Sequence, residues 1–254
     1  MSNNYFDFKR FRVEQNNVSM RVNTDGVLLG AWFSVPENKV NPSVLDVGCA
    51  TGVIALIAAQ KIADENCLDF SCDGVETDFS SCIQAQKNFE ASPWKKHLTV
   101  YFTDFVLFSE VVDYKYDAII SNPPYFNNSL KNPSPIKKNA RHTDSLSYSG
   151  LIASSARILK GGGCLSVILP YEEFGGFEEI AKAYGFKLKR SCNVFSKEGD
   201  ASPIRTLGEF QKQNNIAEEK IAEVPVIENL CIMTSDGGFT SDYKALTQAL
   251  YLKF

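Results

Sequence analysis

Ser43-Val-Leu-Asp-Val-Gly-Cys-Ala-Thr-Gly52 is followed directly by an apolar segment, Val53-Ile-Ala-Leu-Ile-Ala-Ala-Gln-Lys-Ile62. The first five residues form a short apolar run of strand length. The segment after Gly52 has the length and composition of a buried helix, with Lys61 in its last turn. Glycines between the two are typical of a tight turn in which the backbone approaches a ligand closely. This stretch therefore predicts a strand, a ligand-binding turn and a helix.

Further strands and helices alternate after this turn. We expect strands at 70–76, 98–102, 116–121 and 164–169, and helices at 24–32, 80–91 and 151–160. We expect Thr24 or Asp25 to cap the first helix, and glycines at 161–163 to end the last one. The alternation predicts an α/β fold with a doubly wound, mostly parallel sheet and helices on both faces.

The pattern changes after Gly185. Strand candidates at 186–195, 206–210 and 229–234 follow, with no helix evident between the first two. This order predicts an antiparallel C-terminal edge to the sheet. A terminal helix is expected at 241–252.

The glycine spacing of the turn distinguishes two kinds of nucleotide site. A dinucleotide turn would need glycines at positions 48, 50 and 53, and the last two positions hold Ala and Val. The spacing acid-x-Gly-x-Gly-x-Gly is met at Asp46, Gly48 and Gly52, with Ala50 in the middle slot. It resembles the S-adenosylmethionine (AdoMet) motif of class I methyltransferases. A methyl group at Ala50 is tolerable if φ is negative.

Acidic residues lie at or after the ends of three predicted strands. Asp46, just before the turn, can attract a cationic group, and Glu76 can accept two ribose hydroxyls. Asp104 can accept an adenine amino group. With Gly48 and Gly52, these residues form the predicted cofactor site.

The strand at 116–121 leads into Asn122-Pro-Pro-Tyr125. Ligands of open α/β sheets bind at the carboxyl ends of strands, and Pro123 and Pro124 would stiffen a loop there. The tetrapeptide resembles the catalytic motif of amino-group methyltransferases, which act on N6 of adenine, on other base amines or on a glutamine amide. We therefore predict that all four residues form the catalytic loop and that no metal is required.

The chemistry of such an amine accounts for these residue types. Its lone pair is delocalised into the ring, so it is a poor nucleophile. The Asn122 side-chain oxygen and the Pro123 carbonyl can accept its two N–H groups and favour a pyramidal nitrogen. Tyr125 can stack on the base, a contact worth ~1–3 kcal/mol. A base in a helix or stacked loop would have to be flipped into this pocket.

The chain resembles the bacterial tRNA1(Val) adenine N6-methyltransferase family over nearly its whole length. The segments that match are Met20–Trp32, Asn88–Trp94, Asn122–Phe126, Ala140–Thr143 and Tyr251–Phe254. The resemblance implies AdoMet as the cofactor, tRNA(Val) as the partner, the adenine beside the anticodon as the acceptor, and a seven-stranded class I, Rossmann-like sheet. Two positions depart from the family: Ala50 replaces a glycine, and Ile204 stands where a basic residue is common.

Two basic runs without acidic residues, 126–143 and 181–197, gain meaning from this resemblance. Alone, each is better explained as a solvated face. With the resemblance, the first run can cover the flipped base and the second can hold the RNA backbone. The predicted substrate-binding residues are Phe126, Lys131, Lys137, Lys138, Arg141, Lys189 and Arg190.

Residues 1–40 are predicted to form an N-terminal extension that packs on the cofactor and RNA side of a methyltransferase domain at 41–254. Phe6, Phe8, Arg10 and Arg12 suggest either a patch that stacks on bases and binds phosphates or a buried aromatic cluster with solvated arginines. Both interpretations stay open.

Composition excludes several other classes. The chain has 254 residues, a formal net charge of −4 and 44% hydrophobic residues, which does not fit a basic nucleic-acid coat protein. No apolar run approaches the ~18 residues of a membrane helix, and the N-terminus lacks a secretory signal. Seven irregularly spaced cysteines and two histidines argue against a zinc site or a disulfide framework. We expect a cytoplasmic monomer.

Alternative functions remain. The same motif could methylate DNA adenine, rRNA adenine or a release-factor glutamine. A non-catalytic RNA-binding relative would keep the fold without the activity. A nicotinamide oxidoreductase is disfavoured by the glycine spacing.

Overall fold

The structure is a computed structural model, and it describes residues 3–37, 40–125, 146–214 and 224–253. Its elements in chain order are β1 (Tyr5–Asp7), β2 (Arg12–Glu14), α1 (Thr24–Trp32), β3 (Ser43–Val47), α2 (Val53–Asp64), β4 (Ser71–Glu76), α3 (Phe79–Ala91), β5 (Leu98–Phe102), α4 (Phe105–Val111), β6 (Tyr116–Ser121), α6 (Tyr148–Ile158), β7 (Leu159–Pro170), α7 (Tyr171–Ala183), β8 (Phe186–Lys197), β9 (Arg205–Lys212), β10 (Val226–Met233) and α8 (Ser241–Thr247).

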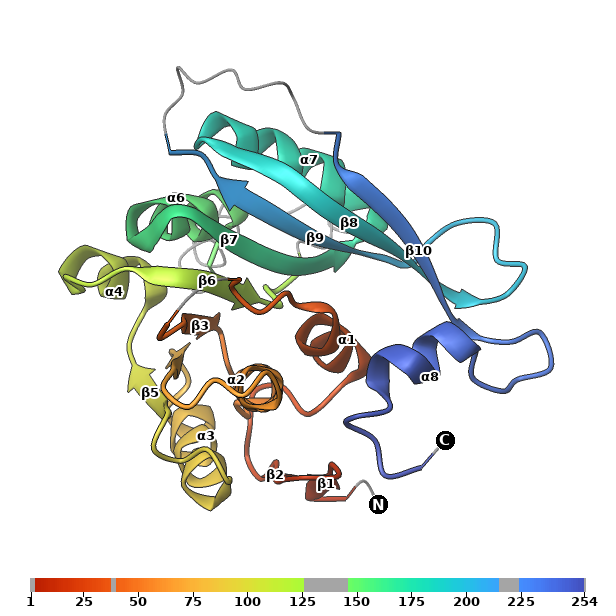
Figure 1. Cartoon of the computed structure of the whole chain (residues 1–254), viewed down its shortest axis with the longest axis horizontal. Helices are drawn as coiled ribbons and strands as arrows, with labels where there is room; N and C mark the ends of the chain where they lie inside the picture. The colour runs from red at the N-terminus through yellow and green to blue at the C-terminus, as the bar shows by residue number, and fades with distance from the viewer. Residues whose placement is uncertain (1–2, 38–39, 126–145, 215–223, 254) are drawn as a thin grey trace, which may run out of the picture.

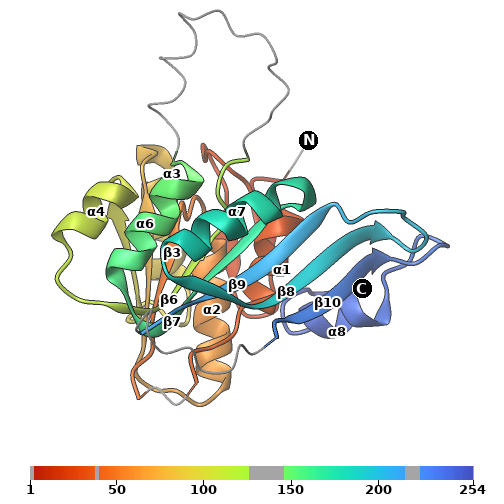
Figure 2. The same cartoon turned by 90° about the horizontal axis from the view of Figure 1, so that it is seen from above.

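Eight strands of the described residues form the central sheet, in the order β10-β8-β9-β7-β6-β3-β4-β5. The five strands β3 to β7 pair in parallel, as predicted. β9 pairs antiparallel with both β7 and β8, which confirms antiparallel pairing in the C-terminal part of the sheet. The outermost strand, β10, runs parallel to β8, so the reversed strand β9 lies two places in from this edge of the sheet. Figure 2 shows β8, β9 and β10 together at one end of the sheet.

Helices cover both faces of the sheet (Figure 1). Buried side chains of α1, α2 and α3 form one apolar cluster, and those of α4, α6 and α7 form the other. This arrangement confirms the doubly wound α/β fold. The sheet has eight strands where the family resemblance implies seven, because β10 adds to β8 at the edge.

The predicted elements agree with the structure except at some ends. Asn23, rather than Thr24 or Asp25, caps α1, because its side chain accepts the N–H of Gly26 at 2.8 Å. The helix expected at 151–160 ends at Ile158, and the glycines at 161–163 lie inside β7. A Cβ at Gly163 would lie 2.9 Å from the carbonyl oxygen of Asp117, so this glycine lets β7 approach β6 closely.

Two helices were not predicted from the sequence. α4 begins directly after Asp104, and α7 fills the interval between β7 and β8. The terminal helix α8 ends at Thr247, five residues earlier than expected.

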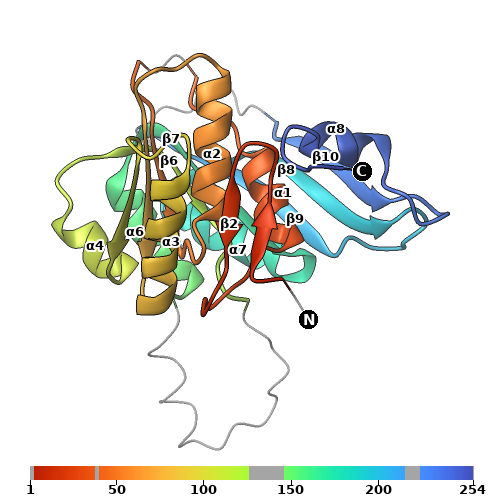
Figure 3. The ribbon, with the colours of Figure 1, turned by 90° about the horizontal axis from the view of Figure 1, so that it is seen from below.

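The N-terminal segment shares the core of the rest of the chain. Phe8, Phe11 and Val13 are buried in the same cluster as α1 and α2, and β2 packs beside α3 (Figure 3). Arg10 forms an ion pair with Asp64 at the end of α2. A buried aromatic cluster with arginines at the surface is therefore the interpretation that the structure favours. The domain boundary at residue 40 stays a prediction.

Two further features belong to the described residues. No helix among them is long and apolar enough to cross a membrane. All seven cysteines are free, and Cys49, Cys72, Cys82 and Cys192 are buried. Buried thiols of this kind pack as small apolar side chains.

The α2 core should tolerate truncation poorly. Leu56 is completely buried, whereas Leu107 on α4 is 60% exposed. Leu56→Ala should lower the free energy of unfolding by about 2–5 kcal/mol, because it leaves a cavity. Leu107→Ala should change it by less than about 1 kcal/mol. Urea unfolding of both variants checks this, and equal losses would contradict the assignment of α2 to the core.

Candidate active site

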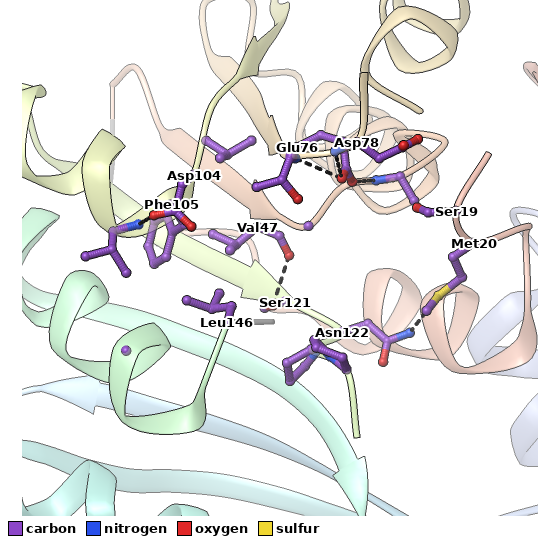
Figure 4. A pocket seen from close by; sticks show the side chains of 18 of the residues that line it. Ser19, Met20, Val47, Glu76, Asp78, Asp104, Phe105, Ser121, Asn122 and Leu146 are labelled. Atoms are coloured by element: carbon purple, nitrogen blue, oxygen red, sulfur yellow. Dashed lines mark hydrogen bonds between the residues drawn. The ribbon is translucent and has the colours of Figure 1, made fainter. Parts of the chain in front are cut away.

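A cavity of about 670 Å³ opens at the carboxyl ends of β3, β4 and β6. Its lining includes Met20, Gly48, Ala50, Glu76, Asp104 and Asn122. Figure 4 shows Glu76, Asp104 and Asn122 around this space, with Met20 facing Asn122 across one side. The structure thus brings together residues from both predicted sites, the cofactor turn and the catalytic loop.

The turn between β3 and α2 has three residues with positive φ. They are Gly48 at 72°, Ala50 at 47° and Gly52 at 78°. A Cβ at Gly52 would lie 2.4 Å from the Phe89 ring, so both the space and the backbone require glycine there. The condition stated for Ala50, a negative φ, is not met. Left-handed backbone costs a non-glycine residue about 1–2 kcal/mol, and Ala50 bears that strain.

Glu76 holds this turn in place. Its Oε2 accepts the N–H of Ala50 at 2.8 Å, and its Oε1 accepts the N–H groups of Thr77 and Asp78 at 2.9 and 2.8 Å. A carboxylate has about four acceptor positions, so one remains on Oε2 for a ligand in this arrangement. Glu76 lines the cavity, and its predicted role toward two ribose hydroxyls stays a prediction.

Asp104 is the N-cap of α4. Its Oδ1 accepts the N–H groups of Val106 and Leu107, at 2.8 and 3.1 Å. This bonding leaves Oδ2 available at the cavity lining, where it can accept an amino group. Asp104 therefore both starts the helix and presents a carboxylate oxygen to the cavity.

Asp46 lies behind the cavity, not in its lining. The carboxyl group is completely buried, and Oδ2 accepts the N–H of Ala55 at 3.1 Å. Burial raises its pKa to about 7, and the carboxylate of Glu76 adds to this effect. The expectation that Asp46 attracts a cationic group of the ligand is not supported by this position. Its visible contact is with the first turn of α2.

The predicted catalytic loop, Asn122–Tyr125, follows β6 directly. Asn122 is half-buried, Pro123 is buried and Pro124 is exposed, and all three line the cavity. No described residue donates a hydrogen bond to the Pro123 carbonyl. Ser121 anchors the loop, since its hydroxyl donates to the Val47 carbonyl at 2.9 Å.

Tyr125 contacts two residues, Asp25 and Arg205, that were not predicted from the sequence as part of the site. Its hydroxyl lies 2.7 Å from Oδ2 of Asp25, and Nε of Arg205 donates to the same oxygen at 2.9 Å. The Arg205 guanidinium lies 4.9 Å from the centre of the Tyr125 ring. Asp25 belongs to the segment Met20–Trp32. The family resemblance of that segment is the sequence signal that could have identified Asp25 as a site residue. Arg205 follows Ile204, the exposed residue that departs from the family pattern.

Burial, followed by the negative charge of Asp25, raises the pKa of Tyr125 above its usual range. The hydroxyl of Tyr125 therefore stays protonated at neutral pH. Its predicted stacking on a base is not tested by this geometry.

Lys189 and Arg190 lie away from the cavity. Arg190 is stacked on Trp32 at 3.7 Å and donates to the Trp32 carbonyl and to Glu209, so its contact with the RNA backbone stays a prediction. Lys189 pairs with Glu209 at 3.1 Å and stays partly exposed. Trp32 and Asp25 lie at opposite ends of α1, about 10 Å apart along its axis.

The remaining substrate-binding predictions lie outside the described residues. They concern Phe126, Lys131, Lys137, Lys138 and Arg141. Among the residues that are described, no group of three or more His, Cys, Asp or Glu side chains is placed to hold a metal ion.

Comparison with known proteins defines the class first. The methyltransferase small domain family matches residues 32–190, so the chain belongs to the methyltransferases built on that domain. A crystal structure of a predicted O-methyltransferase from Agrobacterium tumefaciens shares the fold. Its TM-score is 0.63 at 15% identity, and the match covers 89% of this chain and 96% of that one.

Full-length relatives then define the family. The tRNA1(Val) (adenine(37)-N6)-methyltransferase of Bacteroides fragilis is 37% identical over 256 residues, covering 100% of both chains. The protein of the same name from Phocaeicola vulgatus is 38% identical over 253 residues, covering 99% of each. The chain belongs to the tRNA1(Val) (adenine(37)-N6)-methyltransferase family.

The strain at Ala50 should be removable. Ala50→Gly should raise the free energy of unfolding by about 1 kcal/mol, because glycine adopts positive φ without cost. Ala58→Gly, in the buried middle of α2, should lower it by about 1 kcal/mol or more. Chemical denaturation of the two variants gives the comparison. A loss of stability in Ala50→Gly would contradict the positive φ.

The buried Asp46 should make stability depend on pH. Its pKa is about 7 when folded, above the model-peptide value of 3.8, so the folded state binds the proton more tightly. Folding stability from this group is therefore greatest at low pH and is lost as pH rises from about 4 to 7. Asp46→Asn should remove that loss. Unfolding curves at pH 5 and pH 8 test this, and an unchanged difference between the two pH values would refute it.

Proposed function

We propose that this protein transfers a methyl group from AdoMet to N6 of an adenine in tRNA. The acceptor is the adenine on the 3′ side of the anticodon in tRNA(Val). The observation that carries this proposal is the position of Asn122-Pro-Pro-Tyr125 at the carboxyl end of β6, beside the same cavity as Glu76 and Asp104. The names of the full-length relatives support the choice of acceptor.

The cavity lining fits AdoMet chemically. Glu76 and Asp104 each offer a carboxylate oxygen to donors such as ribose hydroxyls and an adenine amino group. Gly48 lines the cavity, and a Cβ on it would meet no atom within 4 Å, so a side chain there would project into open space. When bound, AdoMet supplies a methyl group on a positively charged sulfur.

The residues of the catalytic loop act on the adenine. The side-chain oxygen of Asn122 and the carbonyl oxygen of Pro123 accept the two N–H groups of the exocyclic amine. This bonding holds the nitrogen in place and directs its lone pair, which contributes positioning rather than covalent catalysis. Pro123 and Pro124 keep the loop rigid, so the two acceptors stay at a fixed separation. The proton released from the amine leaves through water.

The cellular setting follows from the acceptor. A tRNA-modifying enzyme acts where tRNA is found, so we place the protein in the cytoplasm. A single chain supplies both the cofactor lining and the catalytic loop, which supports action as a monomer.

Methyl transfer from labelled AdoMet to unmodified total tRNA tests the proposal. Digestion of the product should release label as N6-methyladenosine. Asn122→Ala should lower the rate by at least about a hundredfold, a loss similar to that of an oxyanion-hole donor. The variant should still bind AdoMet, measured by calorimetry, because Glu76 and Asp104 are unchanged. Asp64→Asn, at the far end of α2, is the matched control and should be fully active.

The outcomes separate the alternatives. AdoMet binding without label in tRNA would redirect the assay to DNA adenine, rRNA adenine and release-factor glutamine. Binding of tRNA without any transfer would favour a non-catalytic relative. Absence of AdoMet binding would contradict a methyltransferase function.

A further inference from the structure

Four side chains from three elements meet beside the cavity. Asn122 and Tyr125 belong to the loop after β6, Asp25 to the first turn of α1, and Arg205 to the start of β9. The structure places Oδ1 of the Asn122 amide 3.1 Å from the Tyr125 hydroxyl. It places Nδ2 of the same amide 3.8 Å from the sulfur of Met20. These contacts form a continuous hydrogen-bond chain from Arg205 through Asp25, Tyr125 and Asn122 to the cavity.

The donors and acceptors of this chain determine where each hydrogen lies. Arg205 can only donate, and the Asp25 carboxylate can only accept. The Tyr125 hydroxyl has one hydrogen, and the charged oxygen at 2.7 Å takes it in preference to an amide at 3.1 Å. The oxygen of Tyr125 is then an acceptor, so the part of Asn122 that faces it must donate.

An amide group keeps its shape when its oxygen and NH2 exchange places. If the Asn122 oxygen faced the Tyr125 oxygen, two acceptors would stand 3.1 Å apart without a hydrogen between them. If the oxygen and nitrogen are exchanged so that the NH2 group faces Tyr125, the Tyr125 hydroxyl donates to Asp25 and accepts from Asn122. The second orientation therefore has the lower energy, since an unmatched polar pair in a half-buried place costs about 1–3 kcal/mol.

We propose that Asp25 is a positioning residue that, through the Tyr125 hydroxyl, turns the NH2 group of Asn122 away from the cavity and its oxygen toward the cavity. Met20 lines the cavity and Tyr125 does not, so the end of the amide near Met20 is the end that faces a ligand. The inference rests on the proposed function, because an amine substrate needs an acceptor at that point. Arg205 balances the charge of Asp25.

Two single variants have different expected effects. Tyr125→Phe keeps the ring but frees the Asn122 amide to rotate, so kcat should fall about tenfold while KM for tRNA stays unchanged. Asp25→Ala removes the charged acceptor, so the Tyr125 hydrogen turns to the oxygen of Asn122 instead. The NH2 group of Asn122 would face the substrate, and kcat should fall about a hundredfold.

The double variant separates positioning from a structural effect. In the Tyr125→Phe background, Asp25→Ala should cause no further loss of kcat, because the hydroxyl that transmits its effect is missing. Equal losses in both backgrounds would overturn the proposal. Asp64→Asn is again the control, since it also removes a carboxylate that pairs with an arginine, Arg10.

A measurement without substrate keeps this test independent of the proposed function. In protein labelled with ¹⁵N-asparagine, an NH2 proton of Asn122 bonded to Tyr125 should resonate downfield. That shift should be lost in Tyr125→Phe and retained in Asp64→Asn. An unchanged Asn122 signal in Tyr125→Phe would overturn the orientation even if tRNA is methylated. A lost shift in an enzyme that fails to methylate tRNA would leave the orientation standing and refute only the proposed function.

Discussion

The bond between Glu76 and the backbone of the β3–α2 turn is the interaction on which the site depends. One buried carboxylate accepts the N–H of Ala50 and two N–H groups after β4, so it joins the ends of two neighbouring strands. The turn, the start of α2 and the start of α3 are thereby placed relative to one another. The floor of the cavity is formed by these same residues, which links the stability of the turn to the shape of the site.

Energetically unfavourable features are concentrated around this bond. Ala50 has a left-handed backbone, and Asp46 is a carboxyl group without exposure to water. Strain of this kind persists where the surrounding structure determines the conformation, and it is common at functional sites. The apolar clusters on both faces of the sheet supply the stability that offsets it. A ligand that approaches the turn meets a backbone that is already in position.

The loop Asn122–Tyr125 is held by contacts from distant parts of the polypeptide. Ser121 bonds to β3, while Tyr125 reaches Asp25 in α1 and, through it, Arg205 in β9. These partners are separated by as many as 180 residues in sequence. Two prolines restrict the backbone of the loop, and the polar chain then restricts the side chain of Asn122. Rigidity of both kinds is what an amine-positioning site requires.

The strand–turn–helix start, the parallel strands and the position of Asn122-Pro-Pro-Tyr125 could all be predicted from the amino-acid sequence, because hydrophobic periodicity, glycine and proline act locally. The sequence also indicated Glu76 and Asp104, since strand ends of a parallel sheet meet at one edge. Three features could not be predicted without the folded structure: Asp46 lies behind the cavity, Arg190 stacks on Trp32, and Asp25 and Arg205 contact Tyr125. Burial and charge pairing of this kind arise from contacts between elements that are far apart in the sequence.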